Sequence, residues 1–139
     1  MVTTHFSKKE LHCRCGCGFG DRMADYHPEL LILIEKVRRR WDKPLIVSSG
    51  ARCKAHSIAE GSSGDSTHCI DRSTGHIKCC AVDFNYFGST QERQDFIDMV
   101  LQMYSAGEIP ELGGLGTGYS NGCVHLDVYH DPDGHLRRW

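Results

Sequence analysis

The segment CAVDFNYF at residues 80–87 alternates between two sets of side chains, and the segment CVHLDVY at residues 123–129 does the same. A two-residue period is typical of β-strands, because successive side chains point to opposite faces of a sheet. In both segments most of the larger apolar residues fall on one face. The opposite face carries Asp83 in the first segment, and His125 and Asp127 in the second. We therefore expect two strands that bury one face and present polar side chains on the other.

Two amphipathic helices are predicted around these strands. Apolar residues recur at helical spacing over residues 28–41, which open on a proline suited to the first helical turn. A second stripe of this kind begins after the capping-box sequence STQE at residues 89–92 and stops at Gly107. Short stretches at residues 45–48 and 112–119 are expected to add strands. The prediction is an α+β fold, with a small, largely antiparallel sheet flanked by two main helices.

The overall composition excludes several classes of partner. A chain of 139 residues can close one hydrophobic core, so we expect a single domain over residues 1–139 and a monomer. The formal net charge is -2, which gives no strong positive field to hold nucleic acid. The longest apolar run, residues 30–34, is too short to span a bilayer, and the opening residues lack the pattern of a signal peptide. We therefore expect no nucleic-acid partner, no transmembrane segment and no signal peptide.

A long segment between the strand expected at residues 45–48 and the strand at residues 80–87 has no regular pattern. Residues 50–75 are rich in Gly, Ser, Asp and Thr and show no hydrophobic period. A loop of this length within a compact domain is usually functional. We expect it to border the active site.

Three residues in and after this loop form a candidate zinc site. His76 and Asp83 are separated by six residues, and His125 lies on the later strand. Two imidazoles and one carboxylate suit Zn²⁺ in a catalytic site, where three protein ligands leave a fourth position for water. Such a water ionises near neutral pH and attacks a carbonyl that the metal polarises. The spacing suggests this site without establishing it, since a His and an Asp also occur six residues apart by chance.

A longer series of motifs surrounds these residues. The series is SSGARC at residues 48–53, His56, TGH at 74–76 with AVD at 81–83, and VHLD at 124–127. It resembles the M15 family of zinc D-Ala-D-Ala carboxypeptidases and related peptidoglycan peptidases. The family pattern is a Ser-Gly-Tyr-Arg stretch, then Ser-x-His-x-x-Gly-x-Ala-x-Asp, then a late His-x-Asp, in that order. The two ends, residues 5–18 and 137–139, are similar to the short single-domain branch found in phages and bacteria.

The resemblance implies both a fold and an activity. The fold would be that of the hedgehog and D-Ala-D-Ala-peptidase group, with one catalytic Zn²⁺ held by His76, Asp83 and His125. The activity would be hydrolysis of a peptide bond in bacterial peptidoglycan by a zinc-activated water, in a D,D- or L,D-type stem peptide or a cross-link. Arg52 is expected near the substrate, where a guanidinium can grip a terminal carboxylate or stabilise an oxyanion, the alternative being a structural salt bridge. A phage endolysin or virion protein is one setting for such an enzyme.

The chain departs from the family pattern at several positions. Ala51 replaces the usual Tyr, Cys79 stands where Gly is common, and residues 61–75 look longer than usual. Several branches of the family place a carboxylate general base three residues before the last zinc ligand. Gly122 occupies that position here, so the usual base is missing.

Two other residues are candidates for proton transfer. Asp127 lies two residues from His125 on the same strand face, so it can orient that imidazole or act as a base. His68, in the long loop, is the other candidate, and the alternative for it is a solvated histidine. The missing base keeps a second function open, a zinc-stabilised module that binds cell wall or a protein without turnover. A nucleic-acid-binding zinc domain is a third interpretation, which the acidic balance disfavours.

Eight cysteines are unevenly distributed along the chain, with three of them close together near the start. His12, Cys13, Cys15 and Cys17 allow three interpretations: a second, structural metal, a bridge to Cys53, or packing by small residues. The spacing Cys-x-Cys is less usual for zinc than Cys-x-x-Cys. Without a signal peptide, we expect reduced thiols.

Overall fold

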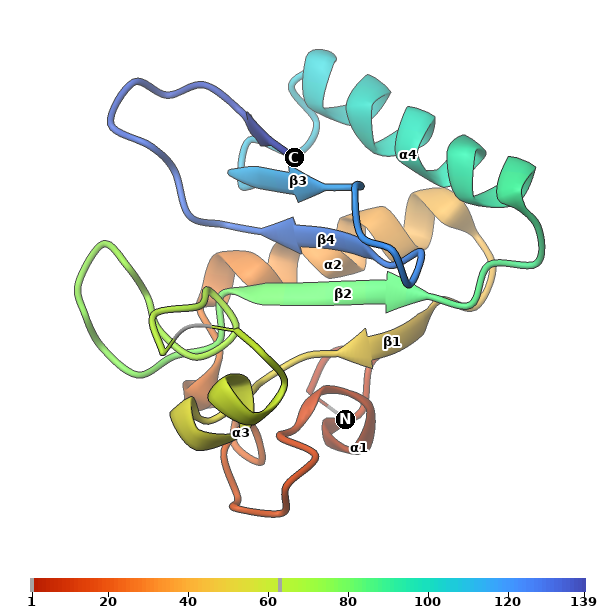
Figure 1. Ribbon diagram of the computed structural model, residues 1–139. Helices are drawn as coiled ribbons and strands as arrows, with labels where there is room; N and C mark the ends of the chain where they lie inside the picture. Colours follow the sequence, from red (N-terminus) through yellow and green to blue (C-terminus); the bar gives the residue numbers. More distant parts are fainter. Residues whose placement is uncertain (1, 63) are drawn as a thin grey trace.

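One mixed sheet organises the chain in the computed structural model, which describes residues 2–62 and 64–139 (Figure 1). The strand order is β1-β2-β4-β3-β5, and every neighbouring pair is antiparallel except β3 and β5. The strands are β1 Ile46–Ser49, β2 Ala81–Asn85, β3 Gly114–Gly116, β4 Val124–Asp127 and β5 Arg137–Arg138. The predicted α+β class and the largely antiparallel sheet are confirmed. Strand β5 was not predicted, because two residues carry no readable period.

The helices include the two that the sequence predicts. They are α1 Lys8–Leu11, the 3₁₀ helix η1 Met23–Asp25, α2 Pro28–Trp41, α3 Lys54–Ala59 and α4 Thr90–Ser105. Helix α2 begins on Pro28 and ends at Trp41. Asp42 follows as its C-terminal cap and adopts a left-handed backbone conformation. The Ser89 side chain caps α4 by accepting a hydrogen bond from the Glu92 amide. Helix α3 lies within the segment predicted to be entirely loop, and its six residues are too few to show an amphipathic stripe.

The two long helices build the core on one face of the sheet. In Figure 1, α2 crosses behind β2 and β4. Phe96 of α4 packs edge-on against Phe84 of β2, with ring centroids 5.9 Å apart, and against Trp41 of α2 at 5.3 Å. The buried residues of α2, α4, β2 and β4 join in one hydrophobic cluster. The apolar face predicted for the two alternating segments therefore lies against the helices.

The opposite face of the central strands is polar. Asp83 of β2 lies directly across from His125 of β4, and Ala81 lies across from Asp127. Because side chains alternate along each strand, this register puts the carboxylates and the imidazole on the side away from α2 and α4. None of the helices in the described residues is long and apolar enough to cross a membrane.

Candidate metal centre

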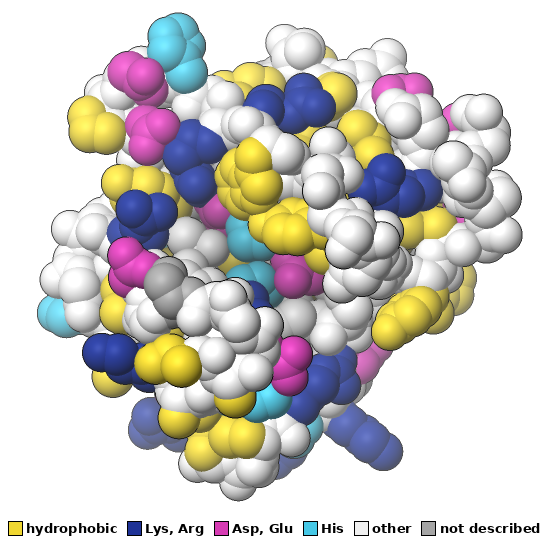
Figure 2. All heavy atoms as spheres, in the orientation of Figure 1, with side chains coloured by type: hydrophobic (Ala, Val, Ile, Leu, Met, Phe, Trp, Pro, Cys, Tyr) yellow, Lys and Arg dark blue, Asp and Glu magenta, His cyan; other side chains and the backbone are white. Residues whose placement is uncertain are grey.

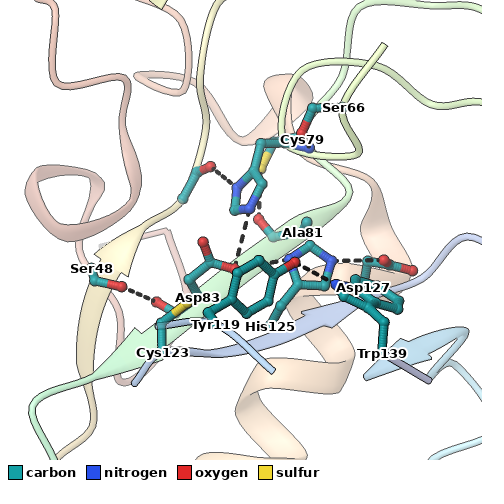
Figure 3. A network of polar contacts seen from close by, with 12 residues as sticks. Ser48, Ser66, Cys79, Ala81, Asp83, Tyr119, Cys123, His125, Asp127 and Trp139 are labelled. Atoms are coloured by element: carbon teal, nitrogen blue, oxygen red, sulfur yellow. Dashed lines mark hydrogen bonds and ion pairs between the residues drawn. The ribbon is translucent and has the colours of Figure 1, made fainter. Parts of the chain in front are cut away.

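Three side chains on the polar face converge closely enough to hold one ion. Asp83 Oδ1 lies 2.8 Å from His125 Nδ1 (Figure 3). It also lies 3.2 Å from His68 Nε2. One ligand atom from each residue lies within 4.8 Å of the others. In a tetrahedral zinc site with bonds of about 2.0–2.1 Å, neighbouring ligand atoms are about 3.3 Å apart. The His68–Asp83 separation is close to that spacing, whereas the His125–Asp83 separation is shorter, at hydrogen-bond distance.

His68 presents one ring nitrogen to this centre. Its Nδ1 lies 2.7 Å from the Gly50 carbonyl oxygen, which can only accept, so Nδ1 carries the proton and donates. Its Nε2 is buried and makes no bond of hydrogen-bonding geometry within the described residues, although Asp83 lies 3.2 Å away. A buried imidazole nitrogen without a well-aligned hydrogen bond is costly unless something binds it. A metal ion at this point would satisfy it.

His125 is held from the other side by a carboxylate. Its Nε2 lies 2.7 Å from Asp127 Oδ2, while its Nδ1 faces Asp83. The other oxygen, Asp127 Oδ1, accepts a hydrogen bond from the Tyr129 amide at 3.0 Å and another from the Arg137 guanidinium. Asp127 is fully buried, so both of its oxygens are engaged with protein groups. A carboxylate that accepts the remote N–H of a ligating histidine is a common arrangement around zinc.

The electrostatics of the metal-free centre follow from these contacts. Burial alone would lower the pKa of His125, but the hydrogen bonds to Asp127 and Asp83 outweigh it and raise the pKa to about 9. Burial would raise the pKa of Asp83, but nearby His68 and the hydrogen bond from His125 hold it far below its ordinary value. Without metal, His125 is therefore protonated at neutral pH and neutralises part of the carboxylate charge. A metal ion would take the place of that proton.

Two glycines of β3 leave room for this arrangement. A Cβ at Gly114 would lie 2.5 Å from the Arg137 guanidinium and 2.7 Å from Asp127 Oδ2. A Cβ at Gly116 would lie 2.7 Å from the Trp139 ring and 2.8 Å from the Tyr119 ring. Side chains at either position would displace groups that surround His125. The two glycines of β3 thus support the site because neither has a side chain that would displace these groups.

The centre lies in a cleft of about 640 Å³. Figure 2 shows histidine and acidic side chains at the bottom of a hollow on this face. Tyr119 and Trp139 stand beside His125, with ring centroids 6.4 Å and 5.0 Å from it, and the Trp139 indole donates to the Tyr119 hydroxyl at 2.5 Å. Arg52 also lines the cleft. A cavity of this size with a few convergent polar groups is typical of a site for a small ligand.

A family model described as Peptidase M15 matches residues 4–127, which include His68, Asp83 and His125. The chain belongs to the peptidase M15 family. Comparisons with curated proteins and with solved structures each gave no significant match. Members of this family are zinc peptidases, and a centre of two histidines and one aspartate provides the donors that a catalytic zinc requires.

The structure does not bring His76 to the M15 centre. Residues 67–70 pair with residues 77–80 through hydrogen bonds from Lys78 N to Cys69 O and from Cys80 N to Thr67 O. The chain thus turns back on itself, and His76 lies exposed in the turn of this hairpin. His68, near the base of the hairpin, takes the place beside Asp83 that was predicted for His76. We correct the candidate ligand set accordingly to His68, Asp83 and His125.

A signal for His68 was available in the sequence. Residues 66–68 read Ser-Thr-His, which fits the Ser-x-His start of the M15 pattern better than Thr-Gly-His at residues 74–76. The spacing to Asp83 favoured His76, because the hairpin inserts extra residues between the two halves of the motif. The unusual length of residues 61–75 pointed to that insertion.

Arg52, which the M15 resemblance places near the substrate, lines the cleft. Its backbone N–H donates to the His68 carbonyl at 3.1 Å, which ties it to a candidate ligand. Its Nε is buried and has no hydrogen-bond partner within the described residues. Because Arg52 lines the cleft, a guanidinium is present in the lining for an anionic ligand.

Proposed function

We propose that this M15 peptidase uses zinc held by His68, Asp83 and His125 to hydrolyse a peptide bond in bacterial peptidoglycan. The observation that carries the proposal is the buried His68 Nε2, which makes no hydrogen bond of normal geometry among the described residues and lies 3.2 Å from Asp83 Oδ1 in the same three-residue cluster as His125. When bound there, zinc supplies Lewis-acid activation of a water and of the scissile carbonyl. A stem peptide or a cross-link is a substrate of the size that the cleft admits.

Other residues of the chain orient the candidate ligands and bind the substrate. Asp127 fixes the ring of His125 through Nε2, and Arg137 in turn holds Asp127. We propose that Arg52 binds the terminal carboxylate of the substrate or the oxyanion that forms during hydrolysis. The position of Arg52 in the cleft lining supports either contact.

The proton acceptor of the reaction cannot come from the position that some family branches use. Gly122 stands there, and its carbonyl accepts a 2.7 Å hydrogen bond from the Arg93 side chain. Among the described residues that line the cleft, the carboxylates outside the metal centre belong to Glu60, Asp65 and Asp127. Because both oxygens of Asp127 are held by protein groups, we propose that Glu60, an exposed carboxylate of the cleft that lies 3.6 Å from the His56 imidazole, accepts the proton.

The test uses purified peptidoglycan fragments, with products detected by mass spectrometry. We expect the zinc-loaded protein to cleave them and His68→Ala to lose cleavage to background. His76→Ala is the matched control, because it removes an exposed histidine from the same hairpin and should retain full activity. Fragments with and without a free terminal carboxylate distinguish a carboxypeptidase from an endopeptidase.

A non-catalytic wall-binding module is the second candidate, and Gly122 is the observation that favours it. That function predicts fragment binding without products at saturating zinc, together with retention on insoluble cell wall. Loss of binding in His68→Ala without any turnover in the unmodified protein would select this second candidate. A phage lysis or virion setting belongs to the first candidate and follows from the resemblance alone.

A further inference from the structure

Four cysteine thiols gather at a second place, formed by the start of the chain and the segment that follows β1. Cys13, Cys15, Cys17 and Cys53 are all free, and their sulfur atoms lie within 4.8 Å of one another. Cys13 Sγ is 3.4 Å from Cys15 Sγ, and Cys15 Sγ is 3.6 Å from Cys53 Sγ. Thirty-five residues separate Cys17 from Cys53, so the fold itself creates this cluster.

The separations match a metal site better than a disulfide. A disulfide bond is about 2.05 Å long, and it would join the sulfurs only in pairs. Four thiolates around zinc, with bonds of about 2.3 Å, lie about 3.8 Å from one another at the corners of a tetrahedron. The observed 3.4 Å and 3.6 Å are close to those edges. Two of the six sulfur–sulfur separations are thus close to tetrahedral edges, and all of them are within 4.8 Å, so one ion can contact all four sulfurs after small shifts.

Backbone N–H groups also support negative charge on two of these sulfurs, those of Cys13 and Cys53. The Cys53 amide donates to Cys13 Sγ at 3.3 Å, and the His56 amide donates to Cys53 Sγ at 3.4 Å from the first turn of α3. N–H groups that donate to sulfur stabilise a thiolate. Gly16 and Gly18 have positive φ, a conformation that lets the chain turn sharply between and after the three early cysteines.

We propose that Cys13, Cys15, Cys17 and Cys53 bind a second, structural zinc ion. The four thiols release their protons as the ion binds, and no electron transfer is involved. Cys15 and Cys17 are exposed, so an ion reaches the cluster from solvent. A tetrahedral set of four sulfurs with no open position has no room for a substrate, which makes this ion structural.

The ion would connect two parts of the cleft wall. Arg14 lies between two of the cysteines, lines the cleft and donates to the Val47 carbonyl at 2.8 Å. Arg52 immediately precedes Cys53 and lines the same cleft. Binding at the four sulfurs therefore fixes the backbone beside two cleft arginines. The site is independent of the His68 centre in its ligands and in its chemistry.

The experiment measures metal content and the near-ultraviolet and visible absorption spectrum of the cobalt-substituted full chain. Thiolate ligands give cobalt an intense charge-transfer absorption, which a centre of two histidines and one carboxylate lacks. We expect about two equivalents of zinc in the unmodified protein and about one in Cys15→Ser. His68→Ala should also hold about one equivalent but keep the thiolate absorption.

Cys79→Ser is the matched control. Cys79 is buried outside the cluster and donates to the Ala81 carbonyl at 3.2 Å, a bond that a serine hydroxyl can also make. This variant should keep both ions. Absence of the thiolate absorption in cobalt-loaded His68→Ala would overturn the proposal even if Cys15→Ser fails to fold. An intact mass that shows disulfides among the four cysteines in freshly purified protein would overturn it as well.

Discussion

Asp127 shows how far a single residue's role depends on its contacts. On the sequence it could be a general base or a residue that orients His125. Its two oxygens contact His125, Arg137 and the Tyr129 amide, and the side chain is fully buried. These contacts leave no oxygen facing a substrate, which favours the orienting role.

Asp127→Asn tests that role. The amide keeps the size of the side chain but weakens its bond to His125, so zinc affinity should fall about 10- to 100-fold. Activity measured at saturating zinc should recover most of the unmodified rate. If the rate stays at background although zinc is fully bound, Asp127 acts as the base. Titration calorimetry and fragment cleavage provide the two measurements.

His125 gives the metal-free protein a defined pH dependence. Its pKa is raised to about 9, so it binds a proton more tightly in the folded chain than in the unfolded chain. The resulting stability is fully present below about pH 6.5 and is lost as the pH rises through about 9. A shift of this size corresponds to on the order of 3 kcal/mol.

Urea denaturation of chelator-treated protein between pH 6 and about pH 10 measures this loss. Zinc displaces the proton, so its apparent affinity should rise about tenfold per pH unit below pH 9. His76→Ala should follow the same curve as the unmodified chain. A metal-free stability that does not fall over this range would contradict the contacts assigned to His125.

At the scale of elements, strand β3 supports the centre because its two glycines have no side chains. Gly114→Ala would place a Cβ 2.5 Å from the Arg137 guanidinium and 2.7 Å from Asp127 Oδ2. We expect a loss of about 1–3 kcal/mol in the free energy of unfolding and weaker zinc binding. Gly118→Ala is the matched control, because its Cβ would meet its nearest neighbour at 3.5 Å, an ordinary contact. Equal effects of the two substitutions would argue against this function of β3.

The elements with a clear period were predictable from the sequence, and the shorter ones were not. Helices α2 and α4 and strands β2 and β4 have enough residues to show which face is apolar. Helix α3 and strand β5 are too short for that. The hairpin over residues 67–80 depends on backbone pairing, which leaves little pattern in the side chains. Asp83 and His125 were therefore identified through their strands, whereas His68 was assigned a different role.

In the whole molecule, the two faces of the sheet have different roles: one packs the hydrophobic core and the other carries the candidate site. Helices α2 and α4 bury one face, and the other face carries the metal centre and the cleft. The centre brings two carboxylates, Asp83 and Asp127, close together, and without metal only His125 and Arg137 among the contacts described above neutralise part of their charge. We therefore expect the metal to contribute to folding as well as to chemistry.

Asp83→Ala should release the catalytic zinc and lower the melting temperature of the zinc-loaded protein. Removal of zinc from the unmodified protein with a chelator should lower it in the same direction. Calorimetry with parallel metal analysis checks both. Unchanged metal content at the His68 centre in Asp83→Ala would show that Asp83 is not a ligand.

The most direct measurement is anomalous diffraction at the zinc absorption edge from crystals of the zinc-loaded protein. We expect a peak about 2.0–2.2 Å from His68 Nε2, a carboxylate oxygen of Asp83 and His125 Nδ1. A peak coordinated by His76, or no peak among these three side chains at full zinc loading, would contradict the assignment of the metal centre.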